Sequence, residues 1–209
     1  MPAERLHLVR HGEVHNPQRV LYGRLPHFGL SDDGRRMAAA AADHLVGLER
    51  AVTGLSASPL QRTRESAEPL AERFRLEPVL DERLIEPTNV FEGRRMRRAL
   101  LNPLNWRHLR APSLPSWGEP YVDVVARMDA AMRDAWDRVE GGDVVLVSHQ
   151  LPIWITHLAV AGLPLRHDPR QRRCALSSVT SFERDGERWR EVDYAEPAAV
   201  AGAIDVGAV

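Results

Sequence analysis

The sequence predicts an α/β fold, in which strands of an open sheet alternate with helices. Short apolar runs typical of buried strands occur at residues 6–9 and 144–147, and apolar residues at helical spacing occupy 30–48 and 153–161. The length of 209 residues and the 44% hydrophobic content suit one compact domain with a full core. We therefore expect a single domain over residues 1–194.

The first half of the chain continues this alternation. The helical run at residues 30–48 precedes a short strand of small residues at 55–57. Ser58 is predicted to be the N-cap of the next helix and Pro59 its first residue, because a hydroxyl acceptor followed by proline is typical of a helix start. A further strand is expected at residues 76–80.

The second half supplies a long helix and an edge hairpin. Apolar residues recur at helical spacing through residues 121–139. An Asp-Gly pair at 185–186 is a strong two-residue turn signal between strands at 177–184 and 188–194. Residues 195–209 are rich in Ala, Gly and Val without a clear period, and are expected to form a loosely ordered C-terminal tail.

Reactive side chains follow the first strand directly. Arg10 and His11 stand where the apolar run ends, and Gly12-Glu13 come next. A neutral imidazole can attack phosphorus, and an adjacent guanidinium can hold phosphoryl oxygens in a bidentate fork. The pair therefore indicates phosphoryl chemistry.

Two later positions favour the same chemistry. Arg62 lies close to the start of the second helix, an end whose free N–H groups and positive dipole favour anions. His149 follows the strand at 144–147 as His11 follows the first. Because ligands of open α/β sheets bind outside the carboxyl ends of the strands, these side chains are expected to converge on one pocket.

In these motifs the chain resembles the histidine phosphatase superfamily, which includes the cofactor-dependent phosphoglycerate mutases. The matching residues are Arg10-His11-Gly12-Glu13, Ser58-Pro59-Leu60 with Arg62 and Ala67, and Ser148-His149. The resemblance runs from about residue 6 to about residue 182. It implies a phosphoglycerate mutase-like fold of three α/β/α layers with a mostly parallel sheet, and a reaction through a phosphohistidine on His11.

The resemblance also implies roles for other residues. Arg10, Arg62 and His149 would form the phosphate pocket, and Glu86, in a Leu-x-Glu pattern, would be the general acid that protonates the leaving alkoxide. The chain departs from the family after Glu86, where a Phe-Gly pair is absent and the segment is one residue short. Glu92 is therefore the alternative acid.

Other departures lie beside the two histidines. Gln150 follows His149 where relatives commonly have glycine, and Trp154 stands where they often have arginine. Asn16 matches an asparagine that usually helps to bind phosphate, whereas Val14 replaces the usual threonine. We expect Asn16 and Gln150 to contact the substrate.

The irregular segment at residues 93–119 is the predicted substrate cap or lid, because long insertions of this kind are often functional. It carries an arginine cluster and several apolar residues, including Leu104 and Trp106. Arg94 and Arg95 are candidate substrate contacts for a ligand with an anionic and an apolar part. The alternative is that the arginines form a solvated helix face.

Composition excludes several classes of site. All 28 basic residues are arginine, which rules out a P-loop lysine, a Schiff base and a Ser-Lys dyad. Cys174 is the only cysteine, so neither an intramolecular disulfide nor a cysteine-type zinc site is expected. We expect a cytoplasmic protein with no membrane partner, since neither a leader pattern nor a membrane-spanning stretch is recognisable.

Several functional alternatives stay open. We favour hydrolysis of a small-molecule phosphomonoester, with mutase-type transfer to a second hydroxyl as the alternative and a low-turnover phosphate-binding or regulatory protein as another. The four-residue spacing of His7, His11 and His15 could suggest a metal site on a helix, but His7 belongs to the first strand and a proline follows closely. Neither a metal nor a cofactor is therefore expected. Nucleic acid is not an expected partner at a net charge of −1, and a homodimer through the cap or the edge hairpin stays open.

Overall fold

A computed structural model describes residues 2–99, 101–109 and 118–198, and its strands form one mixed sheet of order β3-β2-β4-β1-β5-β6. The first four strands in this order run parallel, and β5 and β6 are antiparallel, so the sheet is mostly parallel as predicted. The strands are β1 Arg5–Arg10, β2 Val52–Ala57, β3 Val79–Leu80, β4 Asp143–Ser148, β5 Val179–Asp185 and β6 Arg188–Ala195.

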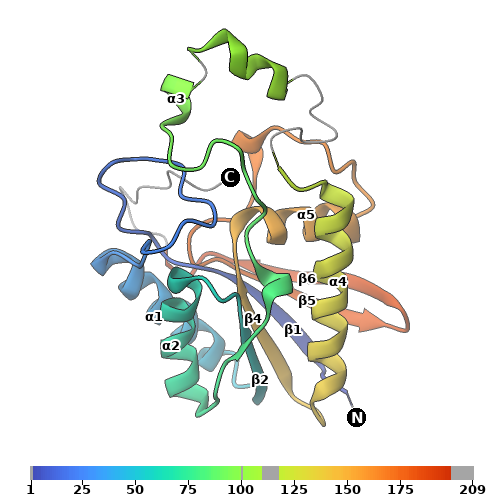
Figure 1. Cartoon of the computed structure of the whole chain (residues 1–209). Helices are drawn as coiled ribbons and strands as arrows, with labels where there is room; N and C mark the ends of the chain where they lie inside the picture. The colour runs from blue at the N-terminus through green and yellow to red at the C-terminus, as the bar shows by residue number, and fades with distance from the viewer. Residues whose placement is uncertain (1, 100, 110–117, 199–209) are drawn as a thin grey trace.

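Helices cover both faces of the sheet, which gives the predicted three layers (Figure 1). On one face lie α1 Asp32–Gly47 and α2 Gln61–Phe74, and on the other lie α4 Tyr121–Arg138 and α5 Gln150–Val160. Shorter helical segments are α3 Met96–Ala99 and three 3-10 turns at Glu82–Leu84, Pro103–Leu109 and Pro169–Gln171. Among the described residues, no helix is both long and apolar enough to span a membrane.

The alternation of side chains along β1 builds the core on both sides of the sheet. Leu6 and Leu8 belong to a buried cluster with α4 and α5, whereas Val9 belongs to a second cluster with α1 and α2. Neighbouring β4 divides its residues in the same way, because successive strand side chains point to opposite faces. The packing of the core therefore fixes the register of β1 against β4, and with it the positions at which the two strands end.

Two predicted helix starts have different outcomes. α1 begins at Asp32, within the helical run expected from residue 30, and the Ser31 hydroxyl caps it by accepting the Gly34 N–H at 3.0 Å. The prediction for Ser58 is wrong, since α2 begins at Gln61 with Leu60 as its N-cap and no side-chain cap. The Ser58 hydroxyl instead bonds a histidine ring at the candidate site.

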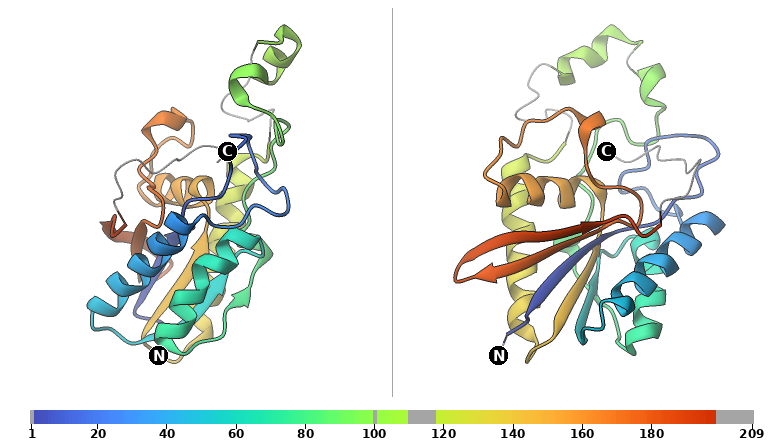
Figure 2. Two further views of the ribbon diagram at one scale, coloured as in Figure 1. Left: turned by 90° about the vertical axis from the view of Figure 1, so that its left-hand side faces the viewer. Right: turned by 180° about the vertical axis from the view of Figure 1, so that it is seen from behind.

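The segment predicted as a cap stands at the carboxyl-end side of the parallel strands (Figures 1 and 2). Its first residues are tied to the loop after β1, because Leu21 donates to the Arg94 carbonyl at 2.9 Å and accepts from the Gly93 N–H at 2.8 Å. Leu101 and Leu104 are 80% and 75% exposed. Residues 100 and 110–117 of this segment lie outside the described residues.

The predicted hairpin is confirmed, since β5 and β6 pair antiparallel around Gly186 with β6 at the edge of the sheet. The first residues of the predicted tail are ordered parts of the fold. Ala195 ends β6, and Ala198 is buried in a cluster with Met37 and Leu176. Residues 199–209 lie outside the described residues.

A close approach of two backbones positions the loop that follows β1. A Cβ atom on Gly12 would lie 2.3 Å from the Gly34 carbonyl oxygen, and one on Gly34 would lie 2.0 Å from the Glu13 carbonyl oxygen. Neither contact can be relieved by a side-chain rotation, because both partners are backbone atoms. The loop after β1 therefore lies directly on the first turn of α1.

We expect Gly34→Ala to lower the free energy of unfolding by about 1–3 kcal/mol, because the added methyl group must push two backbone segments apart. Gly47→Ala in the same helix is the control, since nothing lies within 4 Å of its Cβ position. Helix propensity should make that variant more stable by up to about 1 kcal/mol. Urea unfolding measures both changes, and equal effects would contradict the packing argument.

Candidate active site

The ends of two neighbouring strands bring the two predicted histidines together. Arg10 pairs in register with Ser148 of β4, and the next residue, His11, donates its backbone N–H to the Ser148 carbonyl at 3.1 Å. His149 follows Ser148 at the start of α5, and its ring centroid lies 5.2 Å from that of His11. Both rings are fully buried.

The ring of His11 is held in one orientation and one tautomer. Its Nδ1 lies 2.8 Å from the Gly12 carbonyl oxygen, which can only accept, so Nδ1 carries the hydrogen. Its Nε2 then bears the lone pair, and it has no hydrogen-bond partner among the described residues. Burial, reinforced by Arg62 and Arg10, holds the pKa of His11 well below its usual value. The ring is therefore a neutral imidazole with a free nucleophilic nitrogen.

His149 is fixed by the hydroxyl that sequence analysis assigned to a helix cap. Its Nε2 lies 2.8 Å from the Ser58 Oγ, and its Nδ1 lies 3.7 Å from the nearer carboxyl oxygen of Glu86. Burial first, and then the charge of Arg62, keep the pKa of His149 well below its usual value.

Two buried guanidinium groups lie beside the histidines. Arg10 donates from Nη1 to the Cys174 carbonyl at 2.6 Å. Arg62 donates from Nη2 to the Gly23 carbonyl at 2.8 Å and lies 4.8 Å from the centre of the Tyr22 ring. Burial lowers the pKa of Arg62, so its charge is only partly compensated by the protein. An anion would relieve that cost.

Glu86 is also fully buried, and neither of its carboxyl oxygens has a hydrogen-bond partner in the described part of the chain. Burial raises the pKa of Glu86 to about 7, against the opposing attraction of Arg62 and Arg172. Its backbone is held by Arg24, whose Nε donates to the Glu86 carbonyl. At neutral pH this carboxyl group can therefore both give and take a proton.

The alternative acid, Glu92, has a different environment. One of its carboxyl oxygens accepts the backbone N–H of Arg24 at 3.0 Å, and the side chain is only partly buried. A Cβ atom on Gly23, whose φ is +39°, would collide with this carboxylate. Glu92 thus supports the backbone of the loop that holds Arg62.

Two of the predicted substrate contacts, Asn16 and Gln150, have different surroundings. The Asn16 amide closes a local turn, donating to the Val20 carbonyl at 2.8 Å and accepting the Val20 N–H at 3.2 Å. Gln150 is the first residue of α5 and accepts from Nη1 of Arg172 at 3.2 Å. It is therefore adjacent to His149 and joined to a third arginine.

Arg94 and Arg95 are exposed and line a separate hollow of about 530 Å³. The hollow is lined by Val20, Gly93, Arg94, Arg95, Arg98, Ala99, Asn102 and Asn105. Arg95 donates to the Gln18 carbonyl at 2.8 Å. His11 does not line this hollow, and the expectation that Arg94 and Arg95 contact the substrate stays a prediction.

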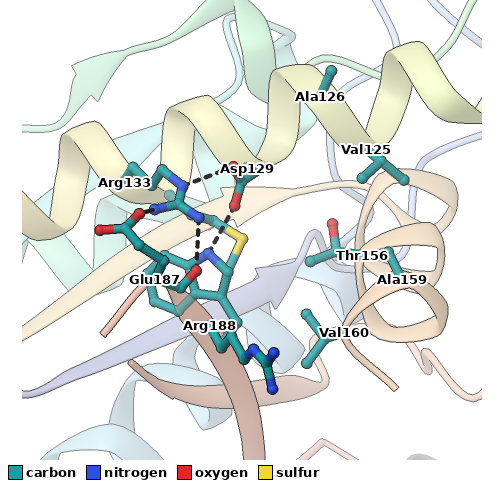
Figure 3. Close-up of a pocket in the computed structure, with 11 residues that line it drawn as sticks. Val125, Ala126, Asp129, Arg133, Thr156, Ala159, Val160, Glu187 and Arg188 are labelled. Atoms are coloured by element: carbon teal, nitrogen blue, oxygen red, sulfur yellow. Dashed lines mark hydrogen bonds and ion pairs between the residues drawn. The ribbon is translucent and has the colours of Figure 1, made fainter. Parts of the chain in front are cut away.

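A second cavity, of about 370 Å³, lies between α4, α5 and the β5–β6 hairpin (Figure 3). Its polar groups bond to one another: Asp129 accepts from Arg133 at 2.8 Å and from the Trp189 indole at 2.9 Å. Arg133 also donates to the Glu187 carbonyl at 2.8 Å. These groups already satisfy one another, so this cavity is not the candidate active site.

Three parts of the site were not predicted from the sequence: Tyr22 beside the Arg62 guanidinium, the Ser58 hydroxyl on His149, and Arg172. Only Arg172 had a usable signal, a run of three arginines at positions 170, 172 and 173. His7, one of the three evenly spaced histidines, bonds Ser181 at 2.9 Å and Asp143 at 3.1 Å, and so lies among β1 and its neighbouring strands.

Comparison with known proteins agrees with this geometry. Residues 6–197 match the histidine phosphatase superfamily (branch 1). The uncharacterized protein Rv0525 of Mycobacterium tuberculosis is 52% identical over 204 residues, which cover 96% of this chain and 100% of that protein. The probable phosphoglycerate mutase GpmB of Cronobacter sakazakii is 29% identical over 182 residues, 83% of each chain.

Among solved structures, a mycobacterial glucosyl-3-phosphoglycerate phosphatase in complex with VO3 superimposes with a TM-score of 0.72 at 30% identity. The match covers 90% of this chain and 97% of that one. A match along nearly the whole chain, together with two buried histidines at adjoining strand ends, makes this protein a member of the histidine phosphatase superfamily.

Proposed function

We propose that the protein hydrolyses small-molecule phosphomonoesters through a phosphohistidine on Nε2 of His11, without a metal ion. The observation that carries this proposal is the buried, neutral His11 ring, whose Nδ1–H bonds the Gly12 carbonyl and whose Nε2 is left without a partner among the described residues. A nitrogen with an available lone pair beside two buried cations suits attack on an anionic phosphoryl group.

In the first step, His11 Nε2 attacks phosphorus and the bond from phosphorus to the ester oxygen breaks. Glu86 gives its proton to the departing oxygen, which leaves as an alcohol. Arg10 and Arg62 stabilise the negative charge on the phosphoryl oxygens. When the Ser58 hydroxyl donates to Nε2 of His149, the hydrogen of that ring lies on Nδ1, from which it can be donated to the phosphoryl group.

In the second step, water attacks the phosphohistidine. Glu86, now a carboxylate, accepts a proton from the attacking water, the bond from nitrogen to phosphorus breaks, and inorganic phosphate leaves. A pKa of about 7 suits a group that donates a proton in the first step and accepts one in the second, because both protonation states of Glu86 are populated near neutral pH.

Transfer of the phosphoryl group to a second hydroxyl is the competing reaction, and the relative named a probable phosphoglycerate mutase supports it. Incubation with 3-phosphoglycerate, with and without its bisphosphate, separates the two reactions. Release of inorganic phosphate identifies a phosphatase, whereas isomer exchange with little release identifies a mutase.

We expect His11→Asn to reduce phosphate release by at least about a thousandfold, since the nucleophile is removed. Labelled phosphate should be trapped on the wild-type protein as an acid-labile adduct and be absent from the variant. His15→Asn, which changes an exposed histidine four residues away, is the control and should keep the wild-type rate. An unchanged rate in His11→Asn would falsify the assignment.

The role of Glu86 predicts a dependence on the leaving group. Glu86→Gln should slow hydrolysis of alkyl phosphates by about 10²–10⁴-fold, but slow p-nitrophenyl phosphate far less, because nitrophenolate leaves without a proton. Wild-type hydrolysis of alkyl phosphates should also decline as the pH rises through about 7. Glu92→Gln is the control, and a leaving-group dependence found there instead would transfer the role to Glu92.

The same carboxyl predicts how stability changes with pH. A folded-state pKa raised from 4.5 to about 7 means that the folded protein binds this proton more tightly than the unfolded chain. Its contribution is therefore fully present below pH 4.5 and is lost as the pH rises through about 7, by about 3 kcal/mol in total. Glu86→Gln lacks this titration. Between pH 5 and pH 7.5, urea unfolding should show the wild type losing stability relative to the variant, and parallel curves would contradict the raised pKa.

A further inference from the structure

Glu86 is held in place through its backbone and not through its carboxyl group. The side chain is fully buried, and neither carboxyl oxygen has a hydrogen-bond partner among the described residues. Three backbone carbonyl groups of residues 83–86 instead accept hydrogen bonds from distant side chains. The direction in which the carboxyl group points therefore depends on how this short segment is held.

The three donors come from separate parts of the fold. Ser148, the last residue of β4, donates from Oγ to the Leu84 carbonyl at 2.7 Å. Arg127 of α4 donates from Nη1 to the Arg83 carbonyl. Arg24, in the loop after β1, donates from Nε to the carbonyl of the candidate acid itself. Two of the three donors are thus guanidinium groups, whose own positions need a partner.

Glu119 is that partner for both guanidinium groups. Its two carboxyl oxygens accept from Nε and Nη2 of Arg127 at 2.8 and 3.1 Å, which is a bidentate pair. Nη2 of Arg24 donates to the same carboxylate at 3.4 Å. The Glu119 and Arg127 side chains are only 18% and 15% exposed, so water screens this pair weakly. One carboxylate therefore orients both arginines that hold the acid segment.

The backbone beside Glu119 lies against the chain that follows the candidate acid. Gly118 forms an isolated antiparallel bridge with Asn89, three residues after Glu86. A Cβ atom on Gly118 would lie 2.2 Å from the Thr88 carbonyl oxygen, so the two backbones are in close contact. Glu119 thus stands where the predicted cap returns to the core, just before α4.

The charged groups around Glu86 are mainly cations. Burial raises the pKa of Glu86 to about 7, and nearby guanidinium groups oppose this effect. These groups are Arg62 of α2, Arg172 before β5, Arg10 of β1 and Arg127 of α4, and the ring of His149 lies 3.7 Å away. Because Glu119 pairs with Arg127, its negative charge weakens the pull of that arginine on Glu86.

We propose that Glu119 is a positioning residue for the general acid, which holds the segment carrying Glu86 through Arg24 and Arg127 and balances the charge of these two arginines. This inference rests on the proposed function, in which Glu86 is the acid. Without the charge of Glu119, the pKa of Glu86 should fall, because Arg127 is no longer compensated. Without Arg127, the pKa of Glu86 should rise.

The pH profile of propyl phosphate hydrolysis tests the balance of charge. Glu119→Gln keeps the shape of the side chain and removes its charge, so Glu86 should lose its proton at a lower pH. The decline in rate that we expect near pH 7 should then move down by about 0.5–1 pH unit. In Arg127→Gln the decline should move up by a similar amount.

Glu187→Gln is the matched control, because Glu187 also joins two arginines, Arg133 and Arg184, but does so at the β5–β6 hairpin. Its profile should match that of the wild type. A general loss of structure would not give shifts of opposite sign. The proposal is overturned if the profiles of Glu119→Gln and Arg127→Gln do not move in opposite directions.

The positioning role has a separate readout. Glu119→Ala removes both the charge and the acceptor, and should lower kcat for propyl phosphate by about 10- to 100-fold with little change in KM. Hydrolysis of p-nitrophenyl phosphate should slow far less, because its leaving group needs no proton. Glu119→Gln keeps an oxygen that can accept from Arg127, and should retain more of kcat at its own optimum pH. Equal slowing of both substrates in Glu119→Ala would overturn the positioning role.

A titration without turnover separates failure of this inference from failure of the proposed function. Carbon-13 NMR follows the carboxyl group of Glu86, whose signal is assigned by its loss in Glu86→Gln, in the wild type, Glu119→Gln and Arg127→Gln. If no phosphomonoester is hydrolysed but the two variants shift this titration in opposite directions, the phosphatase function is refuted and the charge balance stands. If hydrolysis depends on His11 and Glu86 but the titration does not shift, only this inference is refuted.

Discussion

The burial of a neutral histidine beside two guanidinium groups is the constraint around which this site is organised. Removing His11 from water disfavours its charged form, and the two cations strengthen that preference. A buried ring without a fixed hydrogen bond could change its tautomer and its orientation. The Gly12 carbonyl removes that freedom, and the packing of Gly12 on Gly34 fixes the carbonyl in turn.

Two histidines that are close in the chain, His7 and His11, differ in the partners of their ring nitrogens. His7, within β1, bonds Ser181 through one ring nitrogen and Asp143 through the other, and Arg50 forms an ion pair with that aspartate. His11, one residue beyond the same strand, uses one nitrogen for orientation and leaves the other without a partner among the described residues. Both rings are fully buried, so exposure alone does not distinguish them.

Much of the architecture and the meeting of Arg10, His11 and His149 could be predicted from the sequence, because both follow from where apolar runs end, whereas Glu86 was expected only from the family resemblance. Arg10, His11 and His149 sit at strand ends, and a parallel register brings such ends together. The roles of these residues remain proposals. Ser58 was misassigned because a hydroxyl before proline is a common helix start, whereas here the hydroxyl bonds a histidine distant in sequence. Arg172 was missed because it lies in the segment between α5 and β5, which carries no periodic signal.

The two backbone hydrogen bonds between Leu21 and residues 93–94 have a mechanical consequence. Tyr22, the next residue, lies under the Arg62 guanidinium, and Gly23 accepts its hydrogen bond. The base of the protruding segment therefore cannot shift without either breaking this short ladder or moving the support of Arg62. A ligand that displaced the segment would therefore act on the proposed phosphate pocket through the three consecutive residues Leu21, Tyr22 and Gly23.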